Sequence, residues 1–191
     1  MVSTRLAVAD LEKFEGTTTL RIDLEHLTPQ AGAQLLKAQG VRGDEAELEQ
    51  ASRDFGGHSL ALTLLGSYLN DVCSGDVRRR NEVGRLDEDV RHGGHARRVM
   101  LSYEKWFGEG PELAVLRMLG LFNRPADSKA VTALRAAPAI PGLTDALQHL
   151  NEPACQQVLA KLRRAKLLAE KDPTQPDTLD AHPLVREHFG Q

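Results

Sequence analysis

Helix-capping residues and glycine or proline breaks recur at short intervals along most of this chain, and they constrain its fold more than any other feature. Thr28 followed by Pro29 is a typical helix start, and Gly40 is a typical helix end. Asp44 begins the next such segment, whose apolar residues recur with a helical period. Only 4% of the residues are aromatic, whereas leucine and alanine are abundant. The pattern predicts a mainly α-helical protein.

A third helical segment is more apolar than its neighbours. Gly56-Gly57 separates it from the second segment, and we expect Ser59 to cap it. It runs from residue 60 to about residue 72 with almost no charge. Because a helix that is apolar on nearly all sides must be buried, we expect this one inside a helical bundle.

The second half of the chain predicts more helices and then a change of period. The expected helical segments are residues 99–107, 113–121, 130–136, 145–150, 151–165 and 183–189. Residues 167–170 and 177–180 flank a turn rich in proline, aspartate and threonine, which predicts a β-hairpin. Three helices, a hairpin and a last helix follow the order of a winged helix, in which the first hairpin strand covers the apolar side of the helices.

Two short β-prone segments, residues 1–6 and 17–24, precede the helices. Two isolated strands leave backbone groups unpaired and offer little apolar surface. Either they pack on the helices that follow, or they belong to a sheet whose remainder is absent from this chain.

Residues 74–94 are polar and of mixed charge, which indicates a solvated helix or a mobile connection. This segment is the expected domain boundary. The expected division is therefore a strand-forming region at 1–24, a helical subdomain at 25–90 and a winged-helix subdomain at 95–191.

Composition and charge exclude several classes of protein. The chain has 24 basic and 27 acidic residues, a net charge of −3, which gives no general attraction to nucleic acid or anionic membranes. Its apolar stretches fall far short of the ~20 residues that a membrane span needs, and no signal region follows Met1. Cys73 and Cys155 are too few and too far apart for a disulfide framework or a thiolate zinc site. We therefore expect a cytoplasmic protein.

Most motifs of catalysis are absent. The sequence has no GxxxxGK(S/T) phosphate loop and no GxGxxG, GxSxG or HExxH motif. Gly56-Gly57 could offer backbone N–H groups to a phosphate, but a tight turn between packed helices is the simpler interpretation. His92 and His95 are too few to hold zinc, so we expect no metal. His58 and His182 each precede an apolar helix, where a ring nitrogen can cap the backbone.

Basic residues gather on the last long helix, which would be the third helix of a winged helix and enters the major groove in DNA-binding proteins of that architecture. They are Lys161, Arg163, Arg164 and Lys166. Acidic residues flank this helix, so a solvated face is the favoured interpretation.

Taken in order, four segments resemble the nucleotide-binding module of STAND-class signalling ATPases, the NB-ARC-like proteins. Ser3-Thr4-Arg5 resembles their sensor motif, two hydroxyl residues followed by arginine. Residues 24–31, LEHLTPQA, are similar to the passage from the last strand of the ATPase sheet into the helical subdomain. Residues 56–62, GGHSLAL, resemble the GxPLAL motif, with Ser59 in place of the proline. Residues 179–185, LDAHPLV, resemble the MHD-like motif at the end of the winged helix.

The resemblance covers nearly the whole chain and implies particular roles. Arg5 would read the γ-phosphate, the turn at Gly57, His58 and Ser59 would line the adenine, and His182 would approach the β-phosphate. The missing proline would weaken the adenine contact. In this family the phosphate loop and the metal-binding strand lie upstream of the sensor arginine, so the two N-terminal strands would be the end of a parallel sheet that is otherwise missing.

By this resemblance the chain is a regulatory part of an ATPase in which ADP or ATP controls conformation and oligomerisation. We expect it not to be an enzyme alone and to bind neither nucleotide tightly. Its expected partners are an upstream ATPase core, on the same or a separate chain, and further copies of the activated parent protein. A winged-helix DNA-binding regulator is the alternative, and a protein-interaction scaffold is a third possibility.

Overall fold

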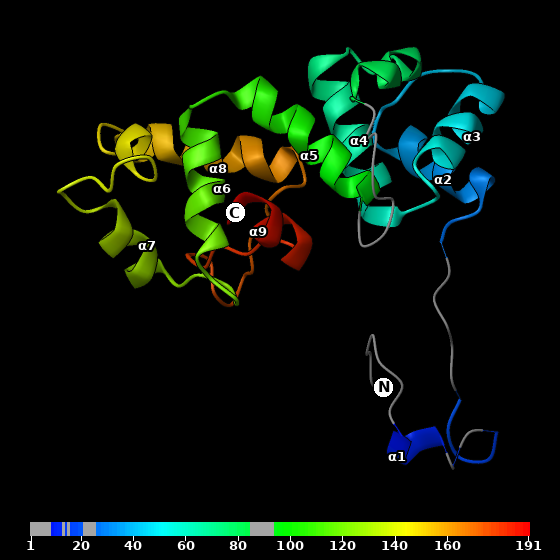
Figure 1. Cartoon of the computed structure of the whole chain (residues 1–191), viewed down its shortest axis with the longest axis horizontal. Helices are drawn as coiled ribbons and strands as arrows, with labels where there is room; N and C mark the ends of the chain where they lie inside the picture. Colours follow the sequence, from blue (N-terminus) through cyan, green and yellow to red (C-terminus); the bar gives the residue numbers. More distant parts are fainter. Residues whose placement is uncertain (1–8, 13, 15, 21–25, 85–93) are drawn as a thin grey trace.

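The computed structural model describes residues 9–12, 14, 16–20, 26–84 and 94–191 and is mainly helical (Figure 1). The elements in chain order are α1 (Ala9–Glu12), α2 (Pro29–Ala38), α3 (Glu45–Asp54), α4 (Ser59–Val72), the 3-10 helix η1 (Val77–Glu82), α5 (Gly94–Phe107), α6 (Pro111–Gly120), α7 (Ser128–Arg135), the 3-10 helix η2 (Asp145–Leu147), α8 (Glu152–Arg164) and α9 (Pro183–Phe189). No helix within these residues is long and apolar enough to cross a membrane.

The first bundle consists of α2, α3, α4 and η1, and its caps follow the sequence. Thr28 accepts a hydrogen bond from the Ala31 N–H and begins α2. Asp44 forms a reciprocal capping box with Glu47 at the start of α3. These two helix starts are confirmed. The start of α4 differs, because the cap is His58 and Ser59 is already the first helical residue.

The polar segment that was expected to be solvated or mobile is packed where the structure describes it. Val77 and Val83 are fully buried, and η1 lies against α3 and α4. Arg80 forms an ion pair with Asp54 at 2.9 Å. Residues 77–82 therefore match the first alternative, a helix with a solvated face, because buried Val77 and Val83 anchor it while Arg78, Arg79 and Glu82 are exposed. Residues 85–93 lie outside the described part of the chain.

The second part of the chain comprises α5 to α9. In it α9 packs mainly against α6 and also against α5, and α8 packs against α6 (Figure 1). Asp127, Asn151 and His182 cap α7, α8 and α9.

The expected β-hairpin is not a ladder in the described residues. The Ala169 N–H donates to the Asp180 carbonyl at 2.8 Å, so the two segments do meet. However, Leu179 forms its antiparallel bridge with Ala126, two residues before α7. The segment at 179–180 therefore lies between residue 169 on one side and the loop before α7 on the other.

The expected N-terminal strands fall largely outside the described residues, which exclude 1–8 and 21–25. Where the structure describes the second one, Thr17 and Thr18 are in a turn, and their N–H groups donate to the Phe14 carbonyl. The short α1 precedes this turn and lies apart from the other helices in Figure 1.

One apolar core runs through both parts of the chain, with α4 packed against α5. Tyr103 of α5 is fully buried at this contact, and its hydroxyl lies 3.3 Å from the carbonyl oxygens of Leu64 and of Ala165. Arg164, at the end of α8, pairs with Asp71 of α4 at 3.0 Å. These contacts connect α4 to α5 and to the end of α8.

Candidate functional site

The turn between α3 and α4 brings two of the motif segments into contact. Gly56 and Gly57 have φ angles of +62° and +63°, a conformation that glycine adopts without a steric penalty. The Leu27 N–H donates to the Gly57 carbonyl at 2.9 Å. A Cβ atom on Gly57 would lie only 2.2 Å from the Leu27 carbonyl oxygen. Only glycine therefore fits here, and the chain before α2 is held against the start of α4.

Three histidines surround this turn. His58 caps α4 through Nδ1, which accepts a hydrogen bond from the Ala61 N–H at 3.3 Å. The ring of His26 lies 5.6 Å from the ring of His58. His95, in the first turn of α5, lies beside Phe55 with its Nε2 close to Gly56. The segment before α2, the start of α4 and the start of α5 thus each contribute one imidazole.

Two of the three histidines, His58 and His95, have lowered pKa values. Burial lowers the pKa of His58 below its usual 6.5, and the neighbouring His26 lowers it further. Burial also lowers the pKa of His95, with additional effects of Arg98 and of the other two histidines. The Arg98 guanidinium stacks 4.1 Å from the centre of the Phe55 ring. The Arg98 cation and the imidazoles of His58 and His26 therefore oppose protonation of His95.

His182 lies in a different set of contacts. It is exposed, and its Nδ1 accepts a hydrogen bond from the Leu184 N–H at 3.2 Å, so the expected capping role is confirmed. Two residues before it, Asp180 forms an ion pair with Arg186 at 2.7 Å. The structure thus groups Gly57, His58 and Ser59 with His26 and His95, and it groups His182 with α9.

Further contacts fix α9 on its neighbours. Glu187 pairs with Arg97 at 2.5 Å, and His188 lies 3.1 Å from Glu104, so both pairs connect α9 to α5. Burial lowers the pKa of His188, although Glu104 acts in the opposite direction. At the other end of α9, a Cβ atom on Gly120 would lie 2.3 Å from the Gly190 Cα.

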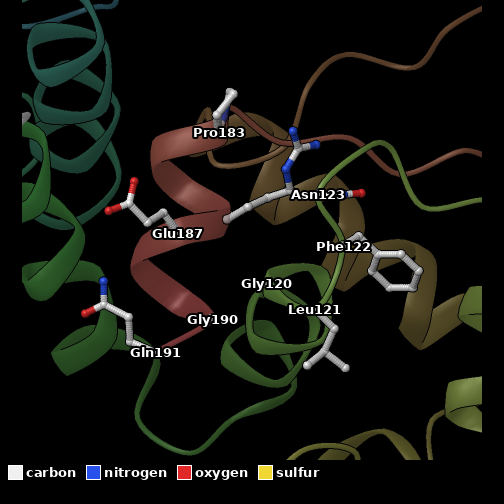
Figure 2. Close-up of a pocket in the computed structure, with 9 residues that line it drawn as sticks. Gly120, Leu121, Phe122, Asn123, Pro183, Glu187, Gly190 and Gln191 are labelled. Carbon is white, nitrogen blue, oxygen red and sulfur yellow. The ribbon is translucent and has the colours of Figure 1, made fainter.

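A cavity of about 480 Å³ lies between the end of α6 and α9 (Figure 2). Its lining residues are Gly120, Leu121, Phe122, Asn123, Pro183, Arg186, Glu187, Gly190 and Gln191. It is wide open and it reaches Pro183, the residue after His182. Within this lining, the two charged side chains of α9 already pair with Asp180 and Arg97.

The remaining candidates are placed as follows. Arg5 lies outside the described residues. No group of three histidine, cysteine or carboxylate side chains that could hold a metal occurs within the described part. On α8, Lys161 pairs with Glu112 at 2.5 Å, and Arg164 pairs with Asp71. Lys166, just after α8, pairs with Glu170 at 2.7 Å.

His26 and His95 were not expected at the site. His26 stands inside the LEHLTPQA passage, whose likeness to the family rests on its leucines, threonine, glutamine and alanine. In the sequence, His95 stands out only as a metal-ligand candidate together with His92. Their meeting with His58 depends on how α5 packs against α4, and the spacing along the chain gives no sign of it.

Comparisons with models of protein families, with curated proteins and with solved structures gave no match. The mainly helical fold and the geometry above are therefore what a functional proposal has to rest on.

Proposed function

We propose that this chain is the regulatory, nucleotide-sensing part of a STAND-type signal-transduction ATPase. In this proposal it comprises a helical subdomain at about 25–90 and a winged-helix subdomain at about 95–191. The observation that carries it is the backbone contact between Leu27 and Gly57, because it joins two of the segments on which the resemblance to this family rests. A contact between the two segments is what a shared binding site requires.

The proposed roles follow the motifs. Arg5 reads the γ-phosphate, the turn at Gly57, His58 and Ser59 lines the adenine, and His182 approaches the β-phosphate. Since His58 and His182 both use Nδ1 to cap their own helices, the nitrogen that would donate to a nucleotide is Nε2 in each. ADP or ATP is the cofactor of the parent protein, and this chain alone is not a catalyst.

The proposed mechanism is a switch. Nucleotide exchange loosens the winged-helix part from an upstream ATPase core and permits oligomerisation of the parent protein. The proposed setting is the cytoplasm. The ion pairs of Arg97 with Glu187 and of Asp71 with Arg164 support a mechanism in which α9 and α8 move together with α5 and α4.

The DNA-binding alternative finds less support. Three of the four basic residues on and just after α8 pair with acidic neighbours, and a helix that reads DNA needs cations that can reach phosphates. The turn at 171–177 carries one positive and two negative charges, which would repel a duplex.

Amide chemical shifts in an NMR titration test the proposal with two halves of the ligand. Adenosine should shift the signals of Gly57 and Ser59, while pyrophosphate should shift those around His182. Binding should be weak, with a Kd of about 1 mM or above, since the phosphate loop supplies much of the affinity in this family. Shifts distributed elsewhere, or sub-micromolar ADP binding, would overturn the proposal.

Ser59→Pro sharpens this test, because it restores the residue that the family motif carries. Ser59 is the first residue of α4, a position that favours proline in any helix. The variant should therefore fold normally and bind adenosine more tightly, with the response to pyrophosphate unchanged. Unchanged adenosine binding would count against an adenine site at this turn.

A further inference from the structure

We propose that the three histidines at the Gly57 turn form a proton-operated latch that holds the segment before α2 against the start of α4 and releases it on acidification. The histidines are His26, His58 and His95. The inference concerns a conformational change driven by pH and does not depend on nucleotide binding.

The first step lies in the cap itself. His58 Nδ1 accepts the Ala61 N–H, so this nitrogen must be unprotonated and the ring proton must be on Nε2. Protonation places an N–H opposite the Ala61 N–H, and the hydrogen bond is lost. The resulting positive charge also faces the positive end of the α4 dipole. An asparagine or serine cap would be unaffected by pH in this range, whereas histidine makes the cap sensitive to it.

The second step lies in the neighbours of His58. His26, on the segment before α2, lies 5.6 Å from the His58 ring, and His95 faces the same turn from α5. Arg98 adds a permanent positive charge from α5. Asp54, at the end of α3, is paired with Arg80 of η1. A proton on His58 is therefore opposed by the neighbouring His26, and a proton on His95 is opposed by Arg98 and by the other two histidines.

The third step connects this repulsion to the chain. His26 directly precedes Leu27, whose N–H is bonded to Gly57, the residue directly before His58. Pushing the two imidazoles apart therefore acts on a hydrogen bond between their immediate neighbours. Loss of the cap and loss of this bond together free residues 26–28 from the turn.

The direction of the pH effect follows from linkage. The pKa of His58 is lowered in the folded protein, with burial as the largest cause and His26 as the next. Such a group stabilises the closed arrangement fully above its unfolded pKa of 6.5, and that contribution is lost as the pH falls through the folded value. Burial and Arg98 give His95 the same direction.

Amide hydrogen exchange, expressed as protection factors, tests the latch at two reporters. Between pH 7.5 and pH 5.5, the Leu27 and Ala61 amides should lose protection by about fivefold or more, as expected when a cap bond of ordinary strength is removed. Amides in α6 should keep theirs. Unchanged protection at Leu27 and Ala61 over this range overturns the proposal.

His58→Asn is the matched variant, since asparagine caps a helix well and does not titrate. It should keep Ala61 protected at pH 7.5 and abolish the pH-dependent loss at both reporters. His26→Asn should move the NMR titration midpoint of His58 to higher pH by removing a neighbouring charge. A pH-dependent loss that persists in His58→Asn overturns the proposal, because the proton would then act elsewhere.

Discussion

Helices α4 and α9 begin in the same way, with a histidine that caps through Nδ1, yet the two starts are held very differently. The α4 cap is half-buried among two other imidazoles and lies next to a glycine turn that bonds to Leu27. The α9 cap is exposed, and α9 has only seven residues against fourteen in α4. A similar local motif is therefore part of the tertiary packing in one place and a local helix start in the other.

The difference shows where the stability of each helix comes from. Contacts along its length hold α9: Glu187 with Arg97, His188 with Glu104, and the close approach of Gly190 to Gly120. The start of α4 depends instead on the geometry of the turn and on its cap. Substitutions at the two helix starts should therefore lower the free energy of unfolding by different amounts.

The largest effect is expected from Gly57→Ala. Alanine is strained at a φ of +63°, and its Cβ would collide with the Leu27 carbonyl oxygen, which is backbone and cannot turn aside. We expect a loss of about 2–4 kcal/mol in the free energy of unfolding, measured by urea denaturation.

Gly142→Ala separates the effect of the backbone conformation from the effect of the collision. Gly142 has a φ of +75°, but a Cβ there would meet no atom within 4 Å. We expect a loss of only about 1 kcal/mol, from backbone conformation alone. Equal losses in the two variants would show that the contact between Leu27 and Gly57 contributes nothing.

A smaller effect is expected from His58→Ala. It removes the cap and part of a half-buried ring, so the free energy of unfolding at pH 7.5 should fall by about 1–2 kcal/mol. His58→Asn should recover most of this loss. If asparagine were no better than alanine, the ring packing would matter and the cap would not.

Much of the helical part of the fold can be predicted from the sequence, because caps and breaks act locally. Thr28 and Asp44 each meet their partners within three residues, so a sequence pattern contains the whole interaction. The start of α4 was misplaced by one residue, since both His58 and Ser59 can cap and the choice depends on the left-handed turn before them.

The contacts that could not be predicted from the sequence are those between residues far apart along the chain. Leu179 alternates with its neighbours as a strand residue should, but its bridge partner is Ala126, more than fifty residues earlier. The histidine cluster has the same character, because His26 and His95 reach His58 only through the packing of α2 and α5 on α4. The Gly57 turn could be proposed as a site from its motif, whereas its imidazole neighbours could not.

The smallest effect on stability is expected from His182→Ala, and it decides what this residue does. The exposed cap bond to Leu184 should contribute about 0.5–1 kcal/mol to the free energy of unfolding, less than the half-buried cap of α4. Thermal unfolding of His182→Ala and His182→Asn should show this loss for alanine and its recovery for asparagine.

The response to pyrophosphate then distinguishes a cap from a phosphate contact. If His182 also donates to a phosphate through Nε2, both variants should lose the chemical-shift response around α9, since neither supplies that nitrogen. If His182 only caps the helix, asparagine should keep both the stability and the response of the unaltered chain. A response that persists in His182→Asn would therefore remove His182 from the proposed nucleotide site and leave α9 with a histidine cap that is purely local.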